Sequence, residues 1–451
     1  MKKSINTSGD SMKYSKEWTE AKCDKYDYLI AVFSGMSAGI IDIFFVGMPG
    51  NSALGNWTDI QADNLVKKFA KTVGWNPREG KEDSIASAIG FLEKKFPVNY
   101  DHAHTVAVNG ALKMAPNNHH YKSLAHSPDI VGLFFSILDQ FQGKSSFLSD
   151  GQIIRIDSNP QNLGLYGNTL PAKLFCGFCN WIGHIMSDLA GSSGGRGNIS
   201  GRGSGVSIPF MELFQICDFG ELQVGKNRQT LATVMTQVFQ NGYDLRFGAT
   251  MSTPVLLNEL MIRVLWMIKK KFFERKDWKE CIPSKKHADL RMMLIVGNAT
   301  LCVIDGADAA IRSGGNTVTL ILRLNIIGWT RLIILVFKEL KIRYGNKVIE
   351  SLSQLLAEIG STLTANECRL INEYYERMRI IDEEISILLA QFEDMINKEY
   401  IIIHGELELA FNSNLNSFDQ AKYSERLAES CKVSNDKIIR NKNDLDDFFL
   451  N

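Results

Sequence analysis

The sequence predicts a mainly α-helical fold, with a multi-helical, membrane-associated core followed by a helical C-terminal bundle or short coiled coil. Residues 28–49 form an apolar run of bilayer length that contains one charge, Asp42. Further long apolar stretches lie between residues 229 and 337. No proline follows Pro283, so the final third of the chain lacks the strongest helix breaker.

Length and composition set the scale of the molecule. A chain of 451 residues is expected to form two or three packed units. Its 50 basic and 50 acidic residues balance, so net charge does not indicate a nucleic acid or nucleotide ligand, which would need a local basic patch. Eight scattered cysteines with one close pair fit a reduced, cytosol-facing protein.

The first two segments predict an arm and a membrane helix. Residues 1–25 are polar, without periodicity, and do not resemble a secretory leader. Four lysines, at positions 13, 16, 22 and 25, precede the apolar run 28–49. If that run spans a membrane, this positive flank keeps the N-terminus cytoplasmic, and we expect the C-terminal domain on the same side. The alternative is a buried core helix rich in glycine and alanine.

Three larger regions follow the arm. Residues 26–215 alternate apolar runs with loops and carry the residues suited to chemistry. Residues 216–344 form an apolar and basic helical region whose basic cluster, 269–276, suits either anionic lipid headgroups or a solvated helix end. Its apolar stretches are interrupted by charges that either pair inside a bundle or mark a soluble core: Asp305, Asp308, Arg323 and Arg331.

The last region, residues 345–451, begins near Tyr344-Gly345. Its apolar residues recur at spacings of three and four with acids between them, which is typical of amphipathic helices in a bundle or coiled coil. We therefore expect a helical C-terminal domain through which the chain could form a homo-oligomer. Membrane lipid is the other expected partner.

His184 and Asp188 are the first candidates for chemistry. Residues four apart on a helix lie on one face, where an imidazole and a carboxylate can share a metal, or the carboxylate can orient the imidazole. A core histidine satisfied by an acid is the alternative. Five of the eight histidines also fall within 25 residues, which is compatible with a hydrolytic metal site that uses His and Asp ligands and a bound water: His102, His104, His119, His120 and His126. A polar loop with capping histidines is the alternative there.

Three short motifs resemble those of the LexA-regulated, membrane-bound metal-dependent hydrolases, the YdjM-like family. Tyr121-Lys-Ser-Leu-Ala-His-Ser127 before an apolar run resembles the family's His-Arg-Gly-x-Thr-His-Ser motif. Gly183-His-Ile-Met-Ser-Asp188, followed by a glycine-rich loop and Gly205-Val-Ser-Ile-Pro209, resembles its later helix and Gly-Val-Pro loop. Gly39-Ile-Ile-Asp42 stands where the family has an acidic turn. The resemblance covers about residues 30–215.

The resemblance implies a multi-helical membrane protein with a divalent metal, either zinc, manganese or magnesium. It implies that His126, His184 and Asp188 are metal ligands or their partners, with Asp42 as a further ligand, and that Asp188 and His126 act in catalysis. The chain departs from the family at Tyr121-Lys122, which replaces His-Arg, and His120 is the candidate substitute ligand. The acidic turn keeps one of its two aspartates.

Two functions are therefore open. The first is a membrane-associated, metal-dependent hydrolase whose His/Asp site activates water. The second is a catalytically degenerate membrane effector or channel of a bacterial toxin or anti-phage system, gated by a ligand or partner. Metal content discriminates between them.

Two further motifs favour structural roles. Cys176 and Cys179 form a single CxxC, which is more simply a pair of small core residues than a redox or zinc site. The glycine-rich loop 191–205 matches no phosphate-binding motif and favours a linker over a nucleotide cradle. No serine or cysteine catalytic motif is recognisable.

Overall fold

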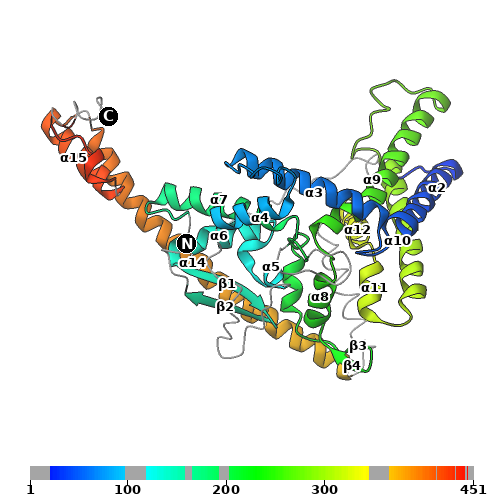
Figure 1. The fold of residues 1–451 in the computed structure, drawn as a ribbon. Helices are drawn as coiled ribbons and strands as arrows, with labels where there is room; N and C mark the ends of the chain where they lie inside the picture. The colour runs from blue at the N-terminus through cyan, green and yellow to red at the C-terminus, as the bar shows by residue number, and fades with distance from the viewer. Residues whose placement is uncertain are drawn as a thin grey trace, which may run out of the picture. The chain divides into compact units, whose positions relative to one another are not determined.

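The computed structural model describes residues 21–96, 118–157, 165–191, 203–344, 365–412, 414–431, 433–441 and 444. Helices dominate these residues and the few strands are short, so the mainly α fold is confirmed (Figure 1). The 1–20 part of the predicted arm, most of the glycine-rich loop, the first amphipathic stretch after Gly345, and His102 and His104 lie outside the described residues.

The chain forms two units, each assembled from separate segments. The first contains residues 1–61, 220–229 and 241–372, and the second contains residues 62–219, 230–240 and 373–451. These units divide the chain differently from the boundaries expected from sequence, because the predicted 26–215 region is split at Gln61. The physical reason is that its first apolar helix packs against helices that come two hundred residues later.

The first unit is a bundle of long apolar helices. These are α2 (Lys25–Ile41), which continues as the π-helix η1 (Asp42–Val46), α9 (Leu245–Ile268), which continues as the π-helix η5 (Lys269–Phe273), α10 (Ala288–Ser313), α11 (Thr317–Arg323) and α12 (Ile326–Tyr344). Helix α10 contacts α2, η1, α9, α11 and α12, and α2 also packs on α9. A small hairpin, β3 (Leu222–Val224) and β4 (Asn227–Gln229), and the first residues of α3 (Ala53–Thr72) complete the unit.

Small residues allow α2 and α10 to approach closely. A Cβ on Gly35 would lie 2.3 Å from the carbonyl oxygen of Gly297 and 2.7 Å from Cβ of Thr300. Small residues at such crossings let helix backbones pack tightly, which is how helices associate where no water drives them together. Asp24 starts α2 as its N-cap by accepting hydrogen bonds from the backbone N–H groups of Tyr26 and Asp27.

The charges that interrupt the later apolar stretches pair inside this bundle. Arg331 forms an ion pair with Glu259, and Arg323 forms one with Asp308. The buried Asp305 side chain accepts hydrogen bonds from the backbone N–H of Asn325 and from the indole N–H of Trp329. Pairing removes much of the cost of placing these charges in an apolar bundle, so the first of the two interpretations applies.

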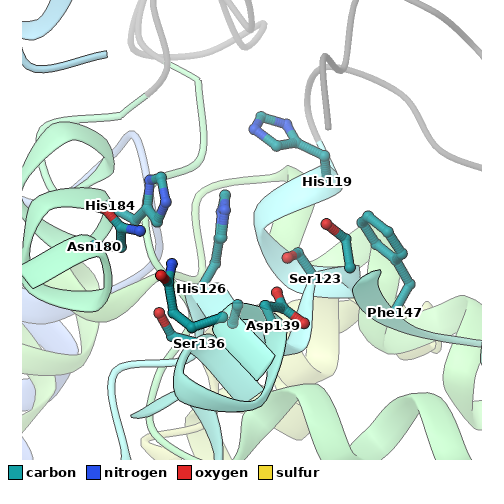
Figure 2. A pocket seen from close by; sticks show the side chains of 11 residues that line it. His119, Ser123, His126, Ser136, Asp139, Phe147, Asn180 and His184 are labelled. Carbon is teal, nitrogen blue, oxygen red and sulfur yellow. The ribbon is translucent and has the colours of Figure 1, made fainter. Parts of the chain in front are cut away.

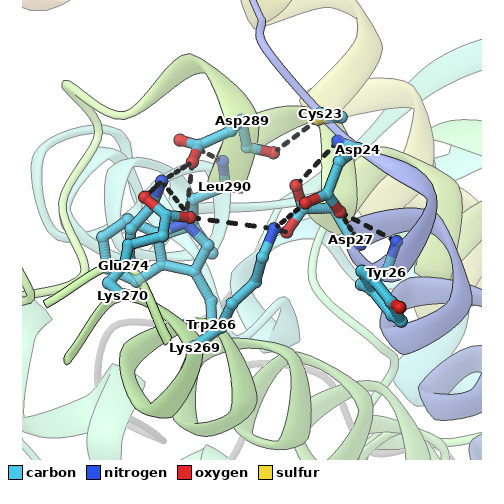
Figure 3. Close-up of polar contacts among 10 residues, drawn as sticks. All are labelled: Cys23, Asp24, Tyr26, Asp27, Trp266, Lys269, Lys270, Glu274, Asp289 and Leu290. Atoms are coloured by element: carbon cyan, nitrogen blue, oxygen red, sulfur yellow. Dashed lines mark hydrogen bonds and ion pairs between the residues drawn. The ribbon is translucent and has the colours of Figure 1, made fainter. Parts of the chain in front are cut away.

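The basic cluster at 269–276 is partly neutralised at one end of the bundle. Figure 3 shows Lys269 reaching Asp24 at 2.8 Å and Asp27 at 2.7 Å, while Lys270 reaches Asp289 at 2.9 Å. The Trp266 indole N–H also donates to Asp289. Two of the cluster's lysines therefore join the start of α2 to α9 and α10.

Three helical segments of the bundle are long and apolar enough to cross a membrane. They are Lys25–Val46, Leu245–Phe273 and Ala288–Ser313, and α11 with α12, bent by 70° at their junction, would make a fourth. Large apolar side chains on α2 and α9 are exposed at helical spacing: Leu29, Phe33, Met36, Ile40, Phe44, Leu256 and Leu260. An outer surface of this kind is consistent with membrane association.

The second unit contains shorter helices and one antiparallel hairpin. Its elements are α4 (Ile85–Lys95), α5 (His119–Lys122), the 3₁₀ turn η2 (Leu124–His126), α6 (Ile130–Gln142), β1 (Lys144–Ser149), β2 (Gln152–Asp157), α7 (Leu170–Asp188), η4 (Met211–Ile216) and α8 (Leu231–Gln240). Most of α14 (Ala365–Ala410), α15 (Ser417–Ser430) and η6 (Asn435–Lys437) follow. Helices α6 and α7 pack together, and both contact η2.

The C-terminal helices match the sequence prediction in type. In the second unit, however, α14 is part of a core shared with the site: Ile381 and Leu388 are buried in one cluster with Leu138 of α6 and Leu148 of β1. The amphipathic face of α14 is therefore covered over this stretch by the chain's own unit.

Candidate metal centre

The candidate site lies where α5, η2 and α7 meet. Helix α7 begins at its N-cap Thr169, whose hydroxyl accepts from Ala172 N–H, and it buries one face through residues spaced by three and four. His184 and Asp188 lie on that face, one turn apart, and both are about 6% exposed. The two residues therefore lie together on one buried helix face, as their spacing predicts.

A tight turn brings His126 to the same place. His126 ends η2, and Asp129 caps the next helix by accepting from the N–H groups of Val131 and Gly132. A Cβ on Gly132 would lie 1.9 Å from the Ser127 carbonyl oxygen, so only glycine fits there. That carbonyl also accepts a hydrogen bond from the Trp181 indole N–H at 2.8 Å, which joins the turn to α7.

Three buried histidines form a group with the geometry of a metal site. The side chains of His119, His120 and His126 each offer one nitrogen, and these nitrogens lie within 4.8 Å of one another. The ring of His184 stacks on that of His126 at a centroid distance of 5.0 Å. This group could hold a metal ion, since imidazole nitrogens are common ligands of zinc and other divalent transition metals.

Asp188 links two of these histidines. Its Oδ1 lies 3.2 Å from Nε2 of His120, and its Oδ2 lies 3.4 Å from Nδ1 of His126. A carboxylate in this position orients the imidazole rings that it contacts. The contacts favour the role of orienting partner over that of direct ligand for Asp188.

Electrostatics set the protonation of the group. Burial lowers the pKa of His184 to about 4, so this imidazole is neutral and able to bind a metal near neutral pH. Burial would raise the pKa of Asp188, but the charges of His120, His126 and His119 hold it well below its usual range. Burial would lower the pKa of His120, yet Asp188 raises it overall. The site thus contains a carboxylate surrounded by imidazoles.

The predicted site residues are mostly brought together. His120, His126, His184 and Asp188 lie in one cluster of the second unit. Asp42 lies in the first unit instead, where the side-chain amide of Asn325 donates a hydrogen bond to its carboxylate. It is held there because the apolar helix that bears it packs into the bundle.

The replacement of His-Arg by Tyr121-Lys122 has a structural outcome. The Tyr121 hydroxyl donates to the Met211 carbonyl oxygen at 3.0 Å, and the Lys122 ammonium donates to the Ser149 hydroxyl at 2.6 Å, so both side chains are engaged elsewhere. His120 belongs to the histidine group.

His119 is the member that sequence reasoning did not select. It belongs to the predicted histidine cluster but was not among the ligands named from the motifs. In the four-residue helix α5 the rings of His119 and His120 lie 3.7 Å apart at their centroids. The adjacent histidines at positions 119 and 120 were the sequence feature that could have indicated His119 as a ligand.

Two other sequence features lie beside this site. The backbone of Ser204 and Gly205, which follow the glycine-rich loop, hydrogen-bonds the His120 side chain. Cys176 and Cys179 lie on α7 as half-buried free thiols, and burial raises the pKa of both, which disfavours a reactive thiolate.

Comparisons with protein-family models, with curated proteins and with solved structures found no match for this chain. The resemblance to the YdjM-like hydrolases remains a prediction from the motifs.

Proposed function

We propose that this chain is a membrane-associated, metal-dependent hydrolase in which a divalent ion, held by His119, His120, His126 and His184, activates a water molecule. The observation that carries the proposal is the buried group of His119, His120 and His126, in which Asp188 contacts two members and His184 stacks on His126. Imidazole ligation with an open position lowers the pKa of a metal-bound water toward neutrality and generates a nucleophile.

The free-energy cost of burying Asp188 among the histidines supports the presence of a bound ligand. Asp188 Oδ2 is enclosed and receives no hydrogen bond from any described residue, and the histidine rings beside it are also withdrawn from water. Buried polar groups without full partners are uncommon and call for an explanation. A bound cation would complement the charge of the carboxylate.

Metal content is the direct test. The protein, purified in detergent without added chelator, is expected to contain near-stoichiometric zinc, manganese or magnesium, and His126→Ala and His184→Ala are expected to lose it. His404→Ala is the matched control, because His404 lies on α14, where its side chain is 44% exposed and contacts Tyr400 and Glu408. Wild-type protein that remains metal-free after dialysis against each of the three ions would contradict the proposal.

The bundle supports the second candidate, a membrane effector or channel. Asn258 and Asn298 are completely buried among apolar helices, and each has a polar side-chain atom that no described residue satisfies. Polar groups of this kind inside membrane bundles often line pathways. Liposomes that hold the protein and release a trapped dye would favour this candidate, and intact liposomes over a range of protein densities would count against it.

We also propose that the N-terminus and the C-terminal helices face the cytoplasm. The lysines before α2 and the free thiols of the described residues support this orientation. A protease added to right-side-out cells should leave both ends intact, whereas cleavage of either end would reverse the assignment.

A further inference from the structure

A small cavity lies beside the histidine group. It has a volume of about 30 Å³, and Figure 2 shows His119, His126 and His184 on its wall together with Ser136, Asp139 and Asn180. A space of this size holds about two water-sized groups. A metal on the histidines would therefore face the cavity, with room for an attacking water and one atom of a reacting group.

Asp139 is a residue of the cavity wall whose buried carboxyl group has an oxygen without a hydrogen-bond partner among the described residues. It lies on α6, is 4% exposed, and receives no side-chain hydrogen bond from any described residue, while its Oδ1 is completely enclosed. Burial raises the pKa of this carboxyl well above its usual range, although the charge of Arg155 acts in the opposite direction. An unpaired buried carboxylate is costly, and burial therefore favours the protonated form of Asp139.

The other polar groups of the wall are engaged or chemically unsuited to give a proton. The Ser136 hydroxyl donates to the Gly177 carbonyl, and the Asn180 amide N–H donates to the Leu165 carbonyl. The Ser145 hydroxyl has no partner among the described residues, but a serine hydroxyl is too weak an acid for proton transfer near neutral pH. Asp139 carries the carboxyl group among the described residues that line the cavity.

We propose that Asp139 is the general acid of this site and protonates the leaving oxygen of an ester substrate whose leaving group is an alcohol. The inference rests on the proposed hydrolase function. A divalent ion on the histidines would activate a water molecule, whose hydroxyl group is gained by the phosphorus or carbonyl carbon. As the bond from that atom to the alcohol oxygen breaks, Asp139 gives its proton to the departing oxygen, and the proton released by the water restores Asp139.

The leaving group provides the test, because a general acid matters for a poor leaving group and little for a good one. Metal-loaded wild type and Asp139→Asn are compared on phenyl and 4-nitrophenyl esters of phosphate and of acetate. Asp139→Asn should lose roughly 10²- to 10⁴-fold in rate on a phenyl ester. On the matching 4-nitrophenyl ester we expect a change below about threefold, since that leaving group departs without a proton.

Controls separate this role from a structural one. Asp157→Asn, which changes an exposed carboxylate at the end of β2, should leave both rates unchanged. Metal stoichiometry and thermal melting of Asp139→Asn should match wild type. If Asp139→Asn does not fold, the wild-type pH profile decides: the phenyl ester should lose rate at alkaline pH where the 4-nitrophenyl ester does not.

The outcomes distinguish this inference from its foundation. Equal loss on both leaving groups, no loss on either, or identical alkaline limbs for the two esters overturns the role of Asp139 and leaves the hydrolase in place. Wild type that contains metal but cleaves neither class of ester overturns the hydrolase, and the role of Asp139 with it.

Discussion

Replacement of Asp188 by asparagine tests how the metal centre is built. The carboxylate contacts Nε2 of His120 at 3.2 Å and Nδ1 of His126 at 3.4 Å, so it orients two of the three histidines in the group. Asparagine keeps the size and shape of the side chain but removes the charge and one acceptor oxygen. Asp188→Asn should therefore perturb ligand orientation while the helix packing of α7 is preserved.

The magnitude follows from the position of the residue. Loss of a carboxylate that orients ligating histidines typically weakens metal binding about 10- to 100-fold. That range corresponds to about 1.4–2.7 kcal/mol of binding free energy. The upper half is expected here, because one carboxylate serves two histidines and water cannot replace it at a site that is about 6% exposed.

Competition with a chromophoric chelator at fixed pH measures this effect. Wild type, Asp188→Asn and the exposed-site control His404→Ala are titrated with the metal found in the purified protein. The control should bind like wild type. A dissociation constant for Asp188→Asn within about twofold of wild type would refute the reasoning, because the contacts of Asp188 would then serve packing alone.

Three other outcomes follow from the structure. Burial and the charge of Asp129 raise the pKa of Glu212 from 4.5 to about 7, so the folded state keeps this proton longer than the unfolded state does. Stability should thus be greatest below pH 4.5 and fall by up to about 3 kcal/mol as pH rises to about 7, a loss that Glu212→Gln removes in thermal melts between pH 5 and 8. Gly35→Ala should destabilise the bundle by roughly 1–3 kcal/mol because its Cβ would meet Gly297, whereas Gly90→Ala, with open space around it, should not lower the melting temperature. Alkaline carbonate washing of membranes should leave the protein in the pellet, and release into the supernatant would exclude spanning helices.

The helical class of this protein is readable from its sequence because it depends on local properties. Apolar run length, periodicity and the position of the last proline each act over a few turns of chain, and α2, α9, α10 and α14 follow them. The pairing of His184 with Asp188 was likewise predictable, since four residues make one turn of helix. The hairpin of β1 and β2 was not anticipated, because its pairing depends on contacts with α6 and η4 rather than on a strong strand pattern.

Long-range packing set the remaining features. No local pattern shows that α2 belongs with helices two hundred residues later, because an apolar face does not specify its partner. The same packing holds Asp42 in the bundle and away from the role that its motif suggested. Histidine spacing could not show that both His119 and His120 join the group, or that Asp139 lines a cavity beside it, because those positions depend on how α5, α6 and α7 meet. Periodicity specifies which side of a helix is buried, and tertiary contacts specify what that side meets.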